Sequence, residues 1–193
     1  MTDQLPTAVL GRTGLRVTRL GFGTALYSAE RPPMMEDHVE RLLSAVLDSG
    51  INFIDTADVY AAGRSEEITG AAITGERDDW VLATKVAGAK GEGANRRGLS
   101  RKWLMRACED SLVRLGTDYI DIYYLHKEDL ETPLSETVRA LGELIRQGKI
   151  RYFGLSNYRS WRVAEVCHIC DGLGIGRPIV SQPYYNAMNR MPE

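Results

Sequence analysis

The sequence predicts an α/β fold, a (β/α)8 barrel of parallel strands preceded by a β-hairpin, on three observations. Short apolar runs alternate with segments whose apolar residues recur at helical spacing, which is typical of a parallel sheet. Polar residues stand at the carboxyl ends of several runs, where a barrel carries its functional groups. A doubly wound nucleotide fold would need Gly-x-Gly-x-x-Gly, but Gly21-Phe22-Gly23 has no third glycine at that spacing.

The elements follow in order along the chain. Runs 7–10 and 15–18 flank a glycine-containing turn and predict a hairpin. Further strands are expected at 20–24, 51–55, 80–85, 120–126, 150–157 and 179–182. Helices are expected at about 35–47, from 65 onward, and at about 101–115, 133–147 and 160–171.

Three residues are predicted to begin or end helices. Ser65 is expected to cap a helix through its hydroxyl, with Glu66 and Glu67 favourably placed in the first turn. Ser100 is expected to cap the helix that ends at residue 115. Gly50 suits a left-handed C-cap.

The chain is short for the fold that it predicts. It has 193 residues, whereas an eight-unit barrel takes about 250. It stops at Glu193, just past the sixth strand. We therefore expect residues 1–193 to form a single barrel domain that lacks its last two βα units and belongs to a longer protein.

Composition excludes several classes of partner. A net charge of −2 argues against nucleic acid and anionic membranes. The chain has no apolar run near 20 residues and opens without signal-peptide features. Three cysteines do not suggest a disulfide framework, so we expect a cytoplasmic protein. Cys167 and Cys170 have CxxC spacing without a second pair, which favours helix packing over zinc, and no metal site is predicted.

Ionisable groups end three of the apolar runs. These groups are Asp55, Lys85 and His126, and Tyr60 follows Asp55 closely. If the strand ends meet, the ammonium favours the phenolate form of the tyrosine, and the carboxylate holds the ammonium. The imidazole can hydrogen-bond a substrate oxygen. Such a set moves a proton to or from an oxygen, and a nicotinamide is required because no side chain donates hydride.

With these residues in place, the sequence resembles the aldo-keto reductases, most closely the branch with aryl-alcohol dehydrogenases and potassium-channel β subunits. The resemblance covers nearly the whole chain. It rests on Leu10-Gly11-Arg12-Thr13-Gly14-Leu15-x-Val17, Gly21-Phe22-Gly23-Thr24, Gly50-Ile51-Asn52-Phe53-Ile54-Asp55-Thr56-Ala57-x-x-Tyr60, Thr84-Lys85, Asp121-x-x-Tyr124-Leu125-His126, Gly148-Lys149-Ile150-Arg151-x-x-Gly154-Leu155-Ser156-Asn157 and Gln182-x-x-Tyr185-Asn186.

The resemblance implies an NADPH-dependent enzyme that reduces small aldehydes or ketones to alcohols. Tyr60 would be the general acid, Lys85 and Asp55 would tune it, and His126 would orient the substrate. The implied cofactor contacts are Ser156, Asn157 and Gln182 on the nicotinamide carboxamide, Asp55 beside them, and Gly23 and Thr24 along the ribose and pyrophosphate. The family's nicotinamide-stacking aromatic and 2′-phosphate-binding residues would come after the sixth strand.

Alternatives remain open at this stage. The protein could be a non-catalytic nucleotide-binding regulator that keeps the same residues. A barrel lyase using Lys85 as a Schiff base is disfavoured, because Asp55 would keep the lysine charged. Ser156 and Asn157 could merely start a helix, and Tyr124 is expected in the barrel core. The glycine-rich stretch 88–98 is interpreted as a loop rimming the substrate site, with a phosphate cradle as the alternative.

Overall fold

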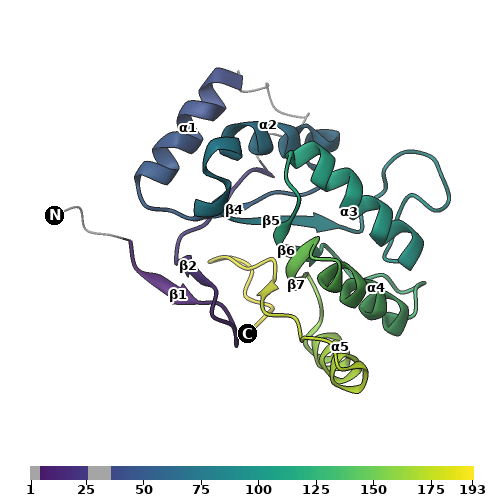
Figure 1. Ribbon diagram of the computed structural model, residues 1–193. Helices are drawn as coiled ribbons and strands as arrows, with labels where there is room; N and C mark the ends of the chain where they lie inside the picture. The colour runs from purple at the N-terminus through teal and green to yellow at the C-terminus, as the bar shows by residue number, and fades with distance from the viewer. Residues whose placement is uncertain (1–4, 26–35) are drawn as a thin grey trace.

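A curled parallel sheet with helices on its outer face organises the chain (Figure 1). The computed structural model describes residues 5–25 and 36–193, excepting the side chains of residues 36–40. The strands are β1 (Thr7–Val9), β2 (Arg16–Thr18), β3 (Phe22–Gly23), β4 (Phe53–Asp55), β5 (Val81–Val86), β6 (Ile120–Leu125), β7 (Ile150–Ser156) and β8 (Ser181–Gln182). The helices are α1 (Glu36–Asp48), α2 (Arg64–Ile73), α3 (Arg101–Leu115), α4 (Leu134–Arg146) and α5 (Ser160–Leu173), with 3-10 helices η2 (Tyr60–Gly63) and η3 (Thr74–Asp79).

The sheet follows the chain order. Strands β3 to β8 pair successively and all pairs are parallel, whereas β1 and β2 form a separate antiparallel hairpin. Asp55 pairs with Ala83, and Lys85 pairs with Tyr124. The carboxyl ends of the strands therefore lie at one end of the sheet. This partial barrel confirms the predicted hairpin and the predicted barrel class.

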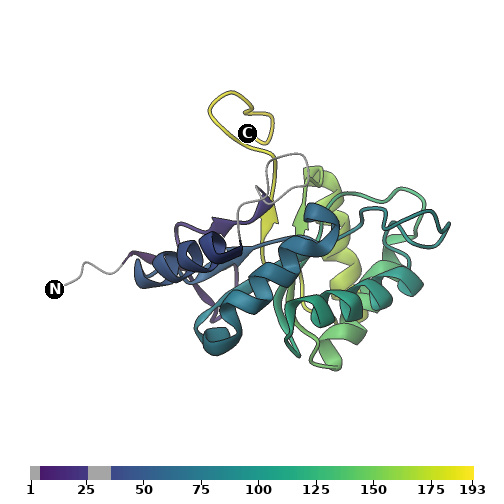
Figure 2. The same ribbon diagram turned by 90° about the horizontal axis from the view of Figure 1, so that it is seen from above.

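The central strands β5 to β7 are largely buried on both faces. In β5 all six residues are buried, and alternate side chains enter two different apolar clusters. Leu82 packs outward with residues of the helices, among them Leu104 and Leu141. Ala83 packs inward with Val17 and Tyr124. Tyr124 therefore lies in the barrel interior, as the sequence predicted. Figure 2 shows the helices along the outer side of the sheet.

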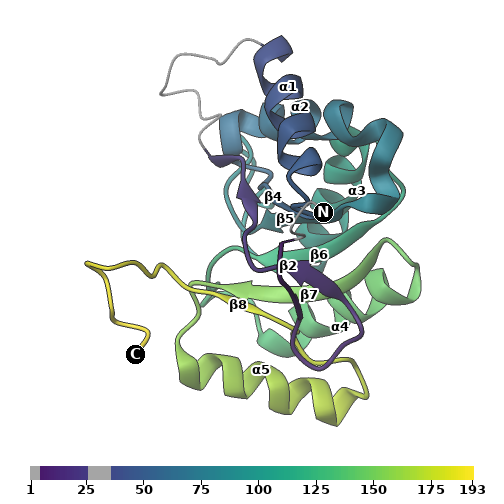
Figure 3. The same cartoon turned by 90° about the vertical axis from the view of Figure 1, so that its left-hand side faces the viewer.

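The hairpin covers the end of the sheet where the strands begin. The Thr18 amide donates to Asn52 Oδ1 at 2.8 Å, just before β4. A Cβ added at Gly11 would lie 2.4 Å from the Ile179 carbonyl oxygen, so only glycine permits this approach. The segment after β8 extends away from the sheet (Figure 3).

Helix ends follow the local sequence in most places, with one correction. Ser100 caps α3, since its hydroxyl accepts from the Trp103 amide, and Gly50 has a φ of 85°. The predicted Ser65 cap is wrong. Helix α2 begins at Arg64 after Gly63, and the Ser65 hydroxyl instead contacts Thr24 Oγ1 at 2.7 Å in the interior. Tertiary contact outweighs capping at this position. Among the residues that the structure describes, no helix is long and apolar enough to cross a membrane.

Candidate active site

The four predicted catalytic residues meet at the carboxyl ends of β4, β5 and β6. Asp55 ends β4, Lys85 is the penultimate residue of β5, and His126 follows β6 directly. Tyr60 opens η2, five residues after Asp55. Parallel pairing of adjacent strands brings these positions together, because all three strands end on the same side.

Lys85 is the centre of the site. Its side chain is 1% exposed, and its ammonium donates to Asp55 Oδ2 at 2.6 Å, Thr56 O at 2.8 Å and Tyr60 Oη at 3.4 Å. An ammonium has three N–H donors, and three acceptors surround this one. An ammonium whose three N–H groups are all engaged offers no lone pair for attack on a carbonyl, which argues against the Schiff-base alternative. It is instead placed to stabilise negative charge on the tyrosine oxygen.

His126 faces Tyr60 and is neutral at physiological pH. The two ring centroids are 5.9 Å apart in an edge-to-face arrangement. Burial, followed by the positive charges of Lys85 and Lys127, lowers the pKa of His126 from 6.5 to about 4. A neutral imidazole can donate or accept a hydrogen bond but holds no spare proton at pH 7. Of these two facing side chains, the Tyr60 phenol is therefore the one whose chemistry suits proton donation.

The residues predicted to contact a nicotinamide lie beside the catalytic four. Ser156 Oγ donates to the Gln182 carbonyl at 3.0 Å, and Asn157 Nδ2 donates to the His126 carbonyl at 3.2 Å. Gln182 Nε2 lies 3.3 Å from Asp55 Oδ2. Helix α5 begins only at Ser160, so Ser156 and Asn157 do not cap it. The strand ends thus gather amide and hydroxyl groups next to the ion pair between Asp55 and Lys85.

This group of residues fits the carboxamide of a nicotinamide. A carboxamide needs both hydrogen-bond donors and acceptors, and the side-chain amide of Gln182 carries both. The Asn157 amide already donates to the His126 carbonyl and Ser156 Oγ and accepts from the Tyr184 amide, so it would have to exchange one of these partners. Asp55 Oδ1 is buried and has no hydrogen-bond partner within the described part of the chain, so the site retains one unused acceptor. Space beside Gly23 is open, since a Cβ built there meets no atom within 4 Å. The residues present therefore suit a nicotinamide cofactor.

Thr24 occupies a different position from its neighbour Gly23. It is fully buried, and its hydroxyl contacts Ser65 Oγ and donates to the Asp55 carbonyl at 3.3 Å. Its backbone amide also donates to the Asp55 carbonyl at 2.9 Å, so both the side chain and the amide of Thr24 are engaged inside the protein. The contacts of Gly23 and Thr24 with a cofactor stay predictions.

The turn that carries Tyr60 is strained, and the sequence did not reveal it. Ala61, Ala62 and Gly63 have φ values of 47°, 57° and 106°, a left-handed run that is costly for alanine. Lys90 bridges this turn, donating to the carbonyls of Asp58 at 2.5 Å and Ala62 at 3.0 Å. Alanine carries no sequence signal for such a conformation, so only the structure identifies Lys90 as its support.

A buried ion pair supports the site from behind. Glu66 is fully buried and accepts from Thr84 Oγ1 at 2.6 Å, next to Lys85, and from Arg114 Nε at 2.7 Å, with which it forms an ion pair. This network connects α2, β5 and α3. The sequence predicted Glu66 in the first turn of α2, which is confirmed, but gave no sign of its buried partners.

The aspartate, tyrosine, lysine and histidine come from the ends of different strands. This arrangement is typical of barrel proteins that carry their functional site at the carboxyl ends of the strands. Comparison with known families identifies the particular member of that class. Residues 19–193 match the model of the Aldo/keto reductase family. The chain therefore belongs to the aldo/keto reductase family, as the resemblance implied.

Its relatives include β subunits of potassium channels. The chain is 40% identical over 184 residues to a probable voltage-gated potassium channel subunit beta of Oryza sativa subsp. japonica, and equally to one of Arabidopsis thaliana. It is 36% identical over 190 residues to a putative one of Schizosaccharomyces pombe. These alignments cover 94–96% of this chain but 55% of each relative. The chain thus spans about half the length of these curated relatives.

Proposed function

We propose that the protein is an NADPH-dependent oxidoreductase that reduces small aldehydes or ketones to alcohols in the cytoplasm. One observation carries the proposal: the Lys85 ammonium contacts both the Tyr60 hydroxyl and the Asp55 carboxylate in a nearly water-free position. Family membership supports an oxidoreductase.

The side chains divide the proton chemistry among them. A bound nicotinamide would supply the hydride that reaches the carbonyl carbon. Tyr60 gives its phenolic proton to the carbonyl oxygen, and Lys85 stabilises the phenolate that remains. Asp55 holds the ammonium in place. The neutral imidazole of His126 donates a hydrogen bond to the same substrate oxygen and orients the carbonyl.

The cofactor is held by the remaining predicted residues. Ser156, Asn157 and Gln182 would bind the carboxamide and so fix the face of the nicotinamide that meets the substrate. Gly23 leaves room for the ribose, and the buried Thr24 would support the Gly23 backbone from behind through its contacts with Asp55 and Ser65.

Substitution of Tyr60 by phenylalanine tests the proposal. Tyr60→Phe should lower kcat for aldehyde reduction by about 10²–10⁴-fold, the usual contribution of a positioned acid, with NADPH binding nearly unchanged. Tyr152→Phe is the matched control. Tyr152 lies four residues before the end of β7, about 13 Å from the strand tip, and should keep full activity. Retained turnover in Tyr60→Phe would refute the assigned role.

A second candidate is a nucleotide-binding regulatory subunit, which the names of the three relatives favour. Such a protein would bind NADPH through the same residues but would act on a channel partner. NADPH binding without measurable reduction over a broad panel of aldehydes and ketones, together with specific binding to a potassium channel, would favour this candidate. Turnover that depends on Tyr60 would favour the reductase.

A further inference from the structure

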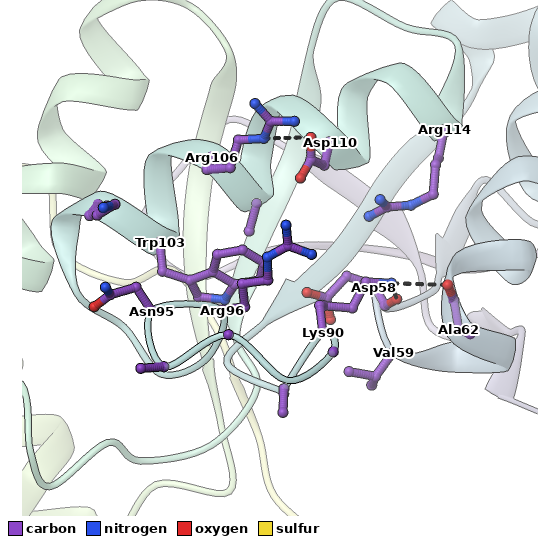
Figure 4. A pocket seen from close by; sticks show the side chains of 16 residues that line it. Asp58, Val59, Ala62, Lys90, Asn95, Arg96, Trp103, Arg106, Asp110 and Arg114 are labelled. Atoms are coloured by element: carbon purple, nitrogen blue, oxygen red, sulfur yellow. Dashed lines mark hydrogen bonds and ion pairs between the residues drawn. The ribbon is translucent and has the colours of Figure 1, made fainter.

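A hollow lies outside the barrel, on the far side of the turn that carries Tyr60. It has a volume of about 1060 Å³ and lies between the 88–98 loop, helix α3 and that turn. Figure 4 shows Trp103, Asn95 and Arg96 on one side and Asp58, Val59 and Ala62 on the other. Its size is that of a small-molecule site. None of the proposed catalytic or nicotinamide-binding residues belongs to its described lining.

Positive charge dominates the described lining. Its basic residues are Lys90, Arg96, Lys102, Arg106 and Arg114, and its acidic residues are Asp58 and Asp110. Arg106 pairs with Asp110, and Arg114 pairs with the buried Glu66 behind the hollow. Within ranges 5–25 and 36–193, the three other basic residues form no ion pair with a carboxylate. The hollow therefore has an excess of unneutralised cations.

Two buried polar groups in the same lining have no hydrogen-bond partner among the residues that the structure describes. Asp58 is 1% exposed and neither carboxyl oxygen is satisfied in good geometry, and the Trp103 indole, 6% exposed, has an unsatisfied Nε1. Buried polar groups nearly always have partners, so each such exception calls for an explanation. A solvated cluster of surface lysines and arginines would not bury either group. A ligand that enters the hollow far enough to reach these atoms would satisfy both.

The geometry points to a binding site for a small molecule that carries a phosphate group. We propose that Lys90, Arg96 and Lys102 neutralise the phosphate, while Trp103 Nε1–H donates to one of its oxygens. Asp58, in its carboxylic acid form, donates to another. The planar guanidinium of Arg96 suits phosphate oxygens, and three unpaired cations suit a dianion better than a monovalent carboxylate. A concave site of this volume favours a small molecule over a macromolecule.

The protonation of Asp58 agrees with this role. Burial and the nearby Glu66 carboxylate raise the pKa of Asp58 to about 7, against the opposing charges of Lys90 and Arg114. Tyr123 of β6 also faces Asp58 and is buried and neutral. The carboxylic acid form is therefore well populated near neutral pH, and a bound anion would favour it further.

Calorimetric titration of the purified protein with inorganic pyrophosphate tests the proposal. Saturating NADPH is present, so that any phosphate site of the cofactor is occupied. Arg96→Gln and Lys102→Gln should each weaken pyrophosphate binding about tenfold or more, because charge-assisted hydrogen bonds are lost. Arg139→Gln, at an exposed position of α4, is the matched control and should bind like the wild type.

Three further measurements separate the contributions. Trp103→Phe keeps the ring but lacks the donor and should weaken binding severalfold. Asp58→Asn should bind more tightly than the wild type at pH 8, where the wild-type carboxylate repels an anion. Citrate should bind clearly more weakly than pyrophosphate. Absence of pyrophosphate binding, equal affinities in Arg96→Gln and Arg139→Gln, or equal binding of citrate would overturn the phosphate site.

Discussion

The buried carboxyl of Asp58 should make the stability of the protein fall as the pH rises. Its pKa is 3.8 in an unfolded chain and about 7 in the folded protein, because burial disfavours its charged form. Between these values the folded state holds more protons than the unfolded state. The free energy of unfolding therefore decreases with increasing pH across this window, and below it the penalty disappears.

The size of the effect follows from the two pKa values. At 1.36 kcal/mol per pKa unit, a raised pKa of this size lowers the free energy of unfolding by at most about 4 kcal/mol above pH 7. Integration over the accessible range places roughly 2–3 kcal/mol of this between pH 5 and pH 8. Asp58→Asn removes the titration. Its stability relative to the wild type should therefore rise by that amount from pH 5 to pH 8.

Urea denaturation at several pH values measures this difference directly, without the ionic screening of a salt denaturant. Because the comparison is between variant and wild type, titration of all other groups cancels to first order. Asp118→Asn, at an exposed aspartate, serves as the control and should show a constant difference. Parallel pH profiles for Asp58→Asn and the wild type would refute the assignment of a buried, titrating carboxyl.

Three other predictions follow from the described contacts. Lys85→Met should lower kcat for aldehyde reduction by about 10²–10³-fold, since a preorganised charge at the tyrosine oxygen is lost; near-normal turnover would contradict this. Arg114→Met should destabilise the protein by about 3–5 kcal/mol in urea, because it leaves the buried Glu66 unpaired, and a second substitution, Glu66→Gln, should restore part of the loss. Gly70→Ala should destabilise by about 1–2 kcal/mol, because its Cβ would lie 2.2 Å from the Leu115 carbonyl oxygen and overpacking outweighs the gain in helix propensity. Gly75→Ala, where a Cβ meets no atom within 4 Å, should change stability by less than about 0.5 kcal/mol, and equal effects of the two would count against the close approach.

Much of the candidate site could be read from the chain because strand ends are local features. Asp55 and Lys85 each follow an apolar run, and parallel pairing then places them together. The resemblance to the aldo-keto reductases then implied a role for each of these residues. His126 was expected to orient a substrate oxygen, but its neutral state became evident only from its burial and the neighbouring lysine charges.

Contacts between elements that are distant in the sequence could not be read in this way. Ser65 has the residue type of a cap, yet the interior contact with Thr24 decides its position. Nothing in the sequence places Lys90 against the Tyr60 turn, because its partners are backbone carbonyls that every residue carries.

The sequence by itself determined the order of strands and helices, most helix ends, and the polar groups at the strand tips. These depend on periodicity and on interactions within a few residues. Only the tertiary structure decided which polar groups are buried, which partners they meet, and that Asp58 and Trp103 line a hollow beside the barrel. The physical reason is that burial and charge pairing depend on packing between α2, α3 and the loop after β5, and this packing is set by the whole chain.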